Sequence, residues 1–219
     1  MSVVRAIILD FDGVLAESNA EKTKAFEELF ALYPEHSEAM LAYHMANHSS
    51  PRMRKFEYYV HELMAQRDND ELVQVMAGQF SAFAVRRVTA CPDVPGARAF
   101  LEEFRSKVPL YVSSVTPQDE LRRIVRARRL THYFADVFGD PPYCKPDAIG
   151  AVLARESLLP SDVLFVGDSA SDYRYATEAG LQFIGRDSGQ PFEGIAIELH
   201  KDMNEIAGIV RRWLGNGGT

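Results

Sequence analysis

Short apolar runs separated by longer amphipathic stretches make up most of the chain. Nearly continuous apolar runs lie at 3–9, 109–113, 163–166 and 182–184, with a weaker one near 135–138. Such runs, rich in Val and Ile, are typical of strands buried on both faces of a sheet. Between them, apolar residues recur at helical spacing. This alternation predicts an α/β fold with a mostly parallel sheet and helices on both faces.

Residues that favour helix ends place some of the boundaries. Thr116 is a candidate N-cap, with Pro117 at the first helical position, and Pro146 begins another helix. Gly180 is a stop for the helix that precedes the run at 182–184.

One region interrupts the alternation. Between about residues 16 and 90 there is no strand pattern, only apolar residues at i, i+3, i+4 and i+7. Their positions are Phe26, Leu29, Phe30 and Tyr33, then Phe56, Tyr59, Val60, Leu63 and Met64, then Leu72, Val75, Met76, Phe80 and Phe83. We expect a Rossmann-like core domain of residues 1–15 and 91–219, with an all-helical, four-helix cap domain of residues 16–90 inserted after the first strand.

Two aspartates follow the first apolar run. Gly13 favours a loop after the strand that brings Asp10 and Asp12 to one site. An ionised Asp can attack phosphorus, and a second Asp can give and take the proton. The alternative is a pair of turn-forming aspartates beside a glycine.

A second acidic segment follows the run at 163–166. Asp168 comes after Gly167, and Asp172 lies four residues further on. Across a parallel sheet from Asp10 and Asp12, these acids crowd negative charge, so they must hold protons or bind a cation. Oxygen ligands that leave room for water and a phosphate suit Mg²⁺. The alternative is that Asp168 caps the following helix.

Two further residues can hold a phosphate group. Lys145 stands before Pro146 at a helix start, where its ammonium can neutralise a nucleophile and phosphoryl oxygens. Ser114, with Ser113 as the neighbouring alternative, ends the run at 109–113, where a hydroxyl and backbone N–H groups can bind an anion. Each of these features alone is weak; their order and spacing together are far more specific.

Composition narrows the partners and the location. A formal net charge of −7 argues against nucleic acid or an anionic membrane as the main partner. The sequence has no run of about 18 apolar residues, which argues against a membrane span. Two cysteines are too few for a disulfide framework, and the N-terminus lacks a signal-peptide pattern. We expect a cytoplasmic protein with no evident obligate protein partner.

The joint pattern resembles the haloacid dehalogenase superfamily. That family has an Asp-x-Asp-Gly strand end, a Ser or Thr after the second strand, a Lys, and a Gly-Asp-x-x-x-Asp segment; the match runs from Asp10 to about Gly185. The resemblance implies a nucleophile (Asp10), a general acid/base (Asp12), phosphate binders (Ser114 and Lys145) and Mg²⁺ ligands or their supports (Asp10, Asp168, Asp172 and the backbone carbonyl of Asp12). The dehalogenases lack the second Asp, so Asp12 favours phosphoryl transfer, in the phosphoglycolate phosphatase and β-phosphoglucomutase-like branch.

These observations favour a Mg²⁺-dependent phosphatase that hydrolyses a small phosphorylated metabolite through an aspartyl-phosphate intermediate. The cap would contribute anion contacts, for which Arg52 and Arg54 are candidates. A phosphomutase like β-phosphoglucomutase is the nearest alternative, because it uses the same core residues. From a different class, a phospho-accepting receiver module also combines acids, a hydroxyl and a Lys, but spans about half this length.

Overall fold

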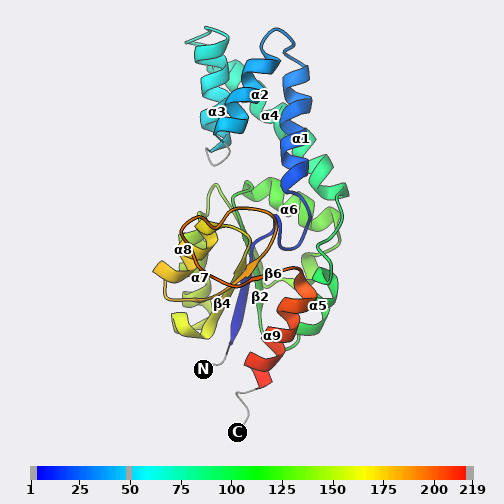
Figure 1. The fold of residues 1–219 in the computed structure, drawn as a ribbon, viewed down its shortest axis with the longest axis vertical. Coiled ribbons are helices and arrows are strands. Elements are labelled where there is room, and N and C mark those ends of the chain that lie inside the picture. Colours follow the sequence, from blue (N-terminus) through cyan, green and yellow to red (C-terminus); the bar gives the residue numbers. More distant parts are fainter. Residues whose placement is uncertain (1–3, 48–50, 216–219) are drawn as a thin grey trace. The chain divides into compact units, whose positions relative to one another are not determined.

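The computed structural model describes residues 4–47 and 51–215. The chain divides into two compact units, each described here by itself (Figure 1). The core unit contains Met1–Asn19 and Cys91–Thr219, and the helical unit contains Ala20–Ala90.

A six-stranded sheet in which all paired strands are parallel forms the centre of the core unit. Its strands are β1 (Ala6–Leu9), β2 (Leu110–Ser114), β3 (Asp136–Gly139), β4 (Val163–Gly167), β5 (Gln182–Arg186) and β6 (Leu199–His200), in the order β3-β2-β1-β4-β5-β6. The predicted fold class is confirmed. The two-residue strand β6 was not predicted, because a half-buried Leu-His pair gives no apolar run.

Helices cover both faces of this sheet, with α7 and α8 on one side and α5 and α9 on the other (Figure 1). The core-unit helices are α5 (Ala97–Phe104), α6 (Gln118–Ala127), α7 (Lys145–Glu156), α8 (Ala170–Glu178) and α9 (Met203–Gly215). Ala6 and Ile8 of β1 pack in one cluster with Ile149 and Val152 of α7. The residues that alternate with them in β1 point to the opposite face and are also fully buried. Burial on both faces explains why the strands are nearly continuous apolar runs.

The start of α6 differs from the prediction. The helix begins at Gln118, with Pro117 as the N-cap residue, and no side chain caps it. The Thr116 hydroxyl instead donates to Asp12 Oδ2, at 3.4 Å. The Gln118 amide bridges to β3, donating to the Val137 carbonyl at 2.7 Å and accepting from Gly139 N–H at 2.6 Å. Thr116 therefore forms a hydrogen bond with a distant residue and does not cap α6.

Four helical segments of the inserted region form the helical unit, which confirms the all-helical insertion. They are α1 (Asn19–Ala31), α2 (Ser37–Ala46), α3 (Arg52–Tyr58), continued by a π-helical turn (Tyr59–Leu63), and α4 (Asp70–Ala90). Phe26, Phe30, Phe56 and Phe80 are among the residues of its buried cluster, and their rings contact one another. Most residues of the predicted helical periods therefore lie in or against the core of this unit, but Val75 is exposed, because α4 turns Val73, Met76 and Phe80 inward instead.

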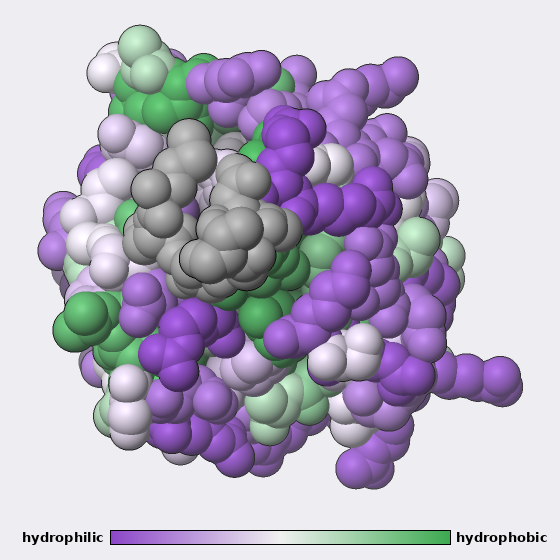
Figure 2. Space-filling view, turned by 90° about the horizontal axis from the view of Figure 1, so that it is seen from below, coloured by the Kyte–Doolittle hydropathy of each residue, from purple (hydrophilic) through white to green (hydrophobic). Residues whose placement is uncertain are grey.

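Among the described residues, no helix is long and apolar enough to cross a membrane. The face of the molecule shown in Figure 2 is dominated by hydrophilic side chains, with hydrophobic groups in small areas.

Candidate active site

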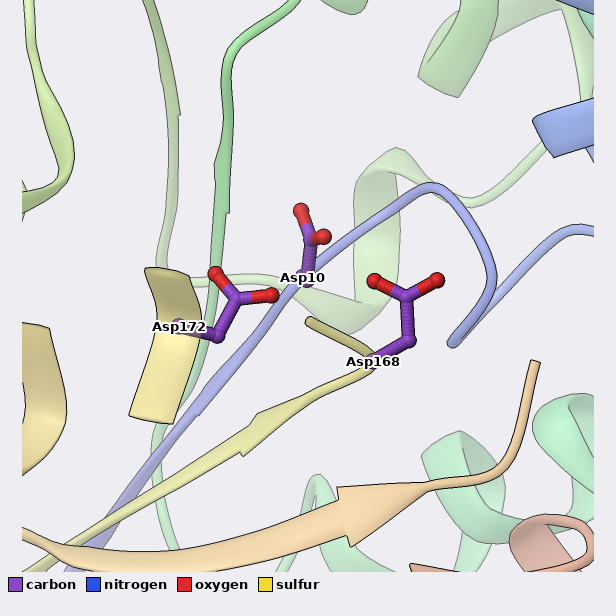
Figure 3. Close-up of side chains that lie close together, drawn as sticks. All are labelled: Asp10, Asp168 and Asp172. Atoms are coloured by element: carbon purple, nitrogen blue, oxygen red, sulfur yellow. The ribbon is translucent and has the colours of Figure 1, made fainter. Parts of the chain in front are cut away.

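Three aspartates meet at the end of the sheet where β1 and β4 finish (Figure 3). Asp10 follows β1, Asp168 follows β4, and Asp172 lies in the first turn of α8. All three are buried, and a carboxylate oxygen of each lies within 4.8 Å of one from the others. The strand order reverses between β1 and β4, and such a switch point is where open α/β sheets bind ligands.

Two glycines let the backbone come this close to the aspartates. Gly13 has φ +71°, and a Cβ there would lie 1.9 Å from Asp168 Oδ2. A Cβ on Gly167 would lie 2.4 Å from the Asp172 Cβ. A side chain at either position would push an aspartate out of the cluster.

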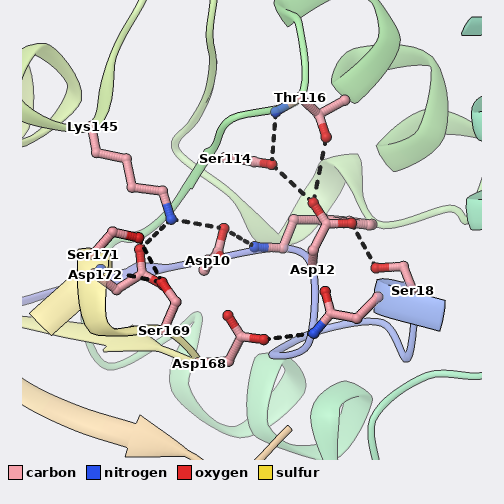
Figure 4. A network of polar contacts seen from close by, with 12 residues as sticks. Asp10, Asp12, Ser18, Ser114, Thr116, Lys145, Asp168, Ser169, Ser171 and Asp172 are labelled. Carbon is pink, nitrogen blue, oxygen red and sulfur yellow. Dashed lines mark hydrogen bonds and ion pairs between the residues drawn. The ribbon is translucent and has the colours of Figure 1, made fainter. Parts of the chain in front are cut away.

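Lys145 supplies the positive charge of the site. It is the first residue of α7, which has a capping box between Cys144 and Asp147 and a proline in its first turn. The Lys145 ammonium forms an ion pair with Asp172 and lies 3.2 Å from Asp10 Oδ1 (Figure 4). Its side chain is only 5% exposed, so the two carboxylates are its environment in place of water.

The titration of these groups reflects burial and mutual charge. Burial raises the pKa of Asp10 well above its ordinary value, and the carboxylates of Asp172, Asp168 and Asp12 add to the rise, while Lys145 opposes it. Burial also raises the pKa of Asp168, although hydrogen bonds from Ser188 and Asn19 oppose this. For Lys145, burial disfavours the charged form, but Asp10 and Asp172 together hold its pKa above the usual value.

Asp12 faces hydroxyl groups, outside the cluster of three carboxylates. Its Oδ1 accepts from the Ser18 hydroxyl at 2.6 Å, and its Oδ2 from the hydroxyls of Ser114 and Thr116 at 3.2 and 3.4 Å (Figure 4). The predicted metal contact through the Asp12 backbone carbonyl stays a prediction. The Asp12 side chain is thus held among hydroxyls, and its role as a proton carrier stays a prediction.

Of the two neighbouring serines at the end of β2, only Ser114 reaches Asp12. The Ser114 hydroxyl also accepts from Thr116 N–H at 3.1 Å. Ser113 Oγ is buried and has no hydrogen-bond partner in the described structure. Because adjacent strand side chains point to opposite faces, the two serines cannot both face the site.

Three polar contacts were missed by sequence reasoning, those of Ser18, Asn19 and Thr116. The Asn19 amide donates to Asp168 Oδ2 at 2.8 Å. The sequence assigned Ser18 and Asn19 to the inserted helical domain and Thr116 to a helix cap. Their polar character directly after a strand-end motif was the available sign, but it is common in linkers.

The charges of the site suit a divalent cation. Asp10, Asp168 and Asp172 set three carboxyl groups beside the ammonium of Lys145 in a buried space, where a bound cation would favour their ionised forms. Hard oxygen ligands are those that Mg²⁺ prefers. The three carboxylates therefore fit the expected metal.

Arg52 and Arg54 lie on α3 of the helical unit. The Arg52 guanidinium lies over the Phe80 ring, 5.6 Å from its centroid, and Arg54 is exposed. Their part in substrate binding stays a prediction.

The sequence model of the haloacid dehalogenase-like hydrolases matches residues 4–180, most of the chain. The chain belongs to this family. The predicted resemblance is confirmed, and the protein is an enzyme of the hydrolase class. A receiver-like signalling module does not fit a match of this extent.

Known proteins support the same fold. A phosphoglycolate phosphatase of Pasteurella multocida (strain Pm70) is 23% identical over 193 residues, which cover 84% of this chain and 86% of that protein. The structure of a predicted phosphoglycolate phosphatase from Haemophilus somnus 129PT aligns with a TM-score of 0.74 at 19% identity, covering 95% of this chain and 99% of the other. A variant of CbbY from Rhodobacter sphaeroides in complex with xylulose 1,5-bisphosphate aligns with a TM-score of 0.69 at 20% identity, covering 92% and 96%.

Proposed function

We propose that the protein is a Mg²⁺-dependent phosphatase that hydrolyses a small phosphorylated metabolite through an aspartyl phosphate on Asp10. One observation carries the proposal: Asp10, Asp168 and Asp172 share a buried site with Lys145, while Asp12 stands beside them among hydroxyls. The family match and the phosphoglycolate phosphatase relative support a phosphatase.

In the first step, a carboxylate oxygen of Asp10 attacks phosphorus, and the bond from phosphorus to the leaving oxygen breaks. Asp12, in its acid form, gives its proton to that oxygen, so the product leaves as an alcohol. The Ser114 hydroxyl and the Lys145 ammonium bind oxygens of the phosphoryl group. Lys145 also favours the ionised form of Asp10, because its charge opposes the rise in pKa that burial causes in that carboxyl.

In the second step, the Asp12 carboxylate takes a proton from a water molecule whose oxygen attacks phosphorus. The bond between phosphorus and Asp10 breaks, which releases inorganic phosphate and restores both aspartates. Mg²⁺, held by Asp10, Asp168, Asp172 and the Asp12 carbonyl, would supply charge neutralisation for the phosphoryl group. Asn19 and Ser169 orient two of these carboxylates, donating to Asp168 at 2.8 Å and to Asp172 at 2.7 Å.

We further propose that residues 20–90 act as a cap that selects the substrate and excludes water, with Arg52 and Arg54 as anion contacts. Replacing Arg52 or Arg54 by Ala would then change the ranking of substrates more than the turnover of a small aryl phosphate. Equal losses on all substrates would assign these arginines a structural part.

A turnover screen tests the reaction and its substrate. Phosphoglycolate comes first, given the relative, followed by sugar phosphates and bisphosphates, nucleotides and glycolytic acids. We expect phosphate release that excess chelator abolishes and Mg²⁺ restores, with Ca²⁺ a poor substitute. Undiminished turnover in excess chelator would contradict the metal dependence, and conversion of a sugar phosphate to its isomer without phosphate release would indicate the mutase.

Rapid-quench experiments with ³²P-labelled substrate can distinguish the roles of Asp10 and Asp12. Asp10→Asn removes the attacking charge, so we expect no phosphoenzyme. Asp12→Ala keeps the nucleophile but loses the proton carrier, a contribution of roughly 10²–10⁴-fold, so aspartyl phosphate accumulates with a nitrophenyl substrate. Label on residue 12, or near-normal turnover in Asp10→Asn, would overturn the assignment.

A further inference from the structure

Arg186 makes a set of contacts at the site that no sequence pattern singled out. It is the last residue of β5, and only 7% of it is exposed. Its Nη1 donates to the Gly13 carbonyl at 3.1 Å, and both Nη atoms donate to the Glu17 carboxylate, at 3.1 and 2.6 Å. Its Nε donates to the Lys201 carbonyl at 3.3 Å. A buried guanidinium bound in this two-pronged way is held in one orientation.

Both partners of Arg186 in the first loop follow Asp12 closely in the sequence. Gly13 follows Asp12 directly, and Glu17 directly precedes Ser18, whose hydroxyl donates to Asp12 Oδ1 at 2.6 Å. Between them the chain makes a tight turn, in which Gly13 N–H donates to the Ala16 carbonyl at 2.8 Å. Arg186 therefore holds both ends of the turn that positions the Asp12 carboxylate.

A shift of this turn would disturb the side chains packed against it. The Gly13 backbone lies so close to Asp168 that a Cβ would be 1.9 Å from its Oδ2. A displacement of the turn would move the Asp12 carboxylate away from the hydroxyls of Ser114 and Thr116, whose contacts are already long at 3.2 and 3.4 Å.

Asp10 is held by different groups. Its backbone N–H donates to the Val166 carbonyl at 2.9 Å, as a continuation of the sheet. Its carboxylate accepts from Phe11 N–H at 2.8 Å and lies 3.2 Å from the Lys145 ammonium. Loss of the Arg186 contacts would therefore disturb the proton carrier more than the nucleophile.

We propose that Arg186 is a positioning residue for proton transfer: through the Gly13 carbonyl and Glu17 it holds the turn that aims Asp12 at the leaving oxygen. The role rests on the proposed function, in which Asp12 gives its proton to that oxygen. The rival explanation is a purely structural link between β5 and the first loop, which would affect all substrates alike.

The chain offers a matched control in Arg128, which is also buried. Its Nη1 donates to the Cys91 carbonyl at 2.8 Å, and its guanidinium pairs with the Asp93 carboxylate. These partners lie in the segment that returns from the inserted region. The two arginines thus have the same chemistry, on different segments of the core unit.

The test compares Arg186→Met and Arg128→Met in the full-length protein with Mg²⁺. Substrates are p-nitrophenyl phosphate, whose leaving group needs no proton, and phosphoglycolate or the best alkyl phosphate of the screen. For Arg186→Met we expect kcat on the alkyl phosphate to fall roughly 10²-fold, toward the loss of proton transfer, and kcat on p-nitrophenyl phosphate to fall less than about tenfold. Arg128→Met should change both by the same factor. In an Asp12→Ala background, Arg186→Met should add no leaving-group dependence.

The outcomes separate the two hypotheses. Wild-type protein that hydrolyses neither substrate would overturn the proposed function and the positioning role together. An active wild type with equal losses on both substrates in Arg186→Met would overturn the positioning role alone. Should Arg186→Met fail to fold, Glu17→Gln decides, since its side chain is 37% exposed and the change keeps its shape. We expect the same leaving-group dependence at roughly three- to tenfold, and equal losses there would overturn the role.

Discussion

Each unit of the molecule buries a lysine, and the two lysines behave in opposite ways. Lys145 of the core unit is 5% exposed, and Lys55 of the helical unit is 2% exposed. Burial disfavours charge on both, but Asp10 and Asp172 hold the pKa of Lys145 above its usual value. The pKa of Lys55 falls to about 8, because burial is the dominant influence on it.

The difference lies in the partners. Lys55 Nζ is 3.3 Å from His44 Nδ1 and 5.3 Å from the centroid of the Phe26 ring. Two buried lysines can therefore have pKa values shifted in opposite directions, and nearby carboxylates are what raise the pKa of Lys145. Under the proposed function the charge of Lys145 acts in catalysis, and for Lys55 we expect the buried charge to lower the stability of the helical unit.

The largest effect is expected where the buried charge acts in catalysis. Lys145→Met removes the ammonium that faces Asp10 and the phosphoryl oxygens, and we expect kcat to fall on the order of 10³-fold. Steady-state kinetics on the best substrate, with circular dichroism to show that the fold is retained, checks this. A loss below tenfold would mean that Lys145 is not a partner of the phosphoryl group.

The next largest effect is expected for the neighbouring serines of β2, which are two buried groups of the same kind with different partners. Ser114→Ala removes a hydroxyl that contacts Asp12, so we expect kcat/KM to fall by about 10–10²-fold, as for a loss of roughly 1.5–3 kcal/mol. Ser113→Ala, the matched control, removes a buried hydroxyl without a partner and should leave activity unchanged. Equal losses in both variants would contradict the assignment of Ser114.

A smaller effect, on stability, is expected for Lys55→Met. Replacing a buried charge by an apolar side chain of similar length should raise the free energy of unfolding of the helical unit at pH 7 by about 1–2 kcal/mol. Hydrogen exchange of backbone amides in residues 20–90 measures it, because the one Trp lies in α9 of the core unit and does not report on this unit. Faster exchange in the variant would show that the contacts of Lys55 outweigh its desolvation.

The smallest expected effect is the pH dependence of the difference in free energy of unfolding between the wild type and Lys55→Met. The pKa of Lys55 is lower in the folded state than in the unfolded chain, so above about pH 8 the unfolded chain binds more protons and the wild type gains stability as pH rises. The loss of stability caused by the buried Lys55 charge is complete below pH 8. It decreases as the pH rises from 8 toward 10.5, the ordinary pKa of a lysine. Comparing wild type with Lys55→Met at each pH cancels other titrations, and we expect the gap to narrow by on the order of 1 kcal/mol. A constant gap would contradict the lowered pKa.

Strands and helices with strong periodicity could be predicted, whereas short or weakly patterned elements could not. The runs that became β1, β2 and β4 are buried on both faces, so their composition alone indicated strands. Strand β6 depends on pairing with the end of β5, which two residues cannot encode. At α6 the local capping pattern was wrong, because Thr116 has a partner in Asp12, far away in sequence.

For the candidate site, the sequence indicated the motif residues and not what holds them. Asp10, Asp12, Ser114, Lys145, Asp168 and Asp172 stand out by type and spacing, at strand ends or at the starts of the helices that follow. The sequence analysis placed Ser18 and Asn19 in the insertion, and no sequence pattern singled out Arg186. Their partners are 6, 149 and 169–173 residues away, so only the folded chain reveals the contacts.

By itself, the sequence determined the α/β class, the helical insertion, the family, and which side chains carry charge and hydroxyl groups. These follow from local periodicity and from motifs a few residues long, which each segment carries regardless of its neighbours. Only the tertiary structure decided that Lys145 contacts carboxylates while Lys55 lies beside a ring and a histidine. It also decided that Ser114 contacts Asp12, while the Ser113 hydroxyl finds no hydrogen-bond partner among the described residues. The physical reason is that the pKa, the hydrogen bonds and the burial of a side chain depend on which distant segments lie next to it. Tertiary packing decides which segments these are.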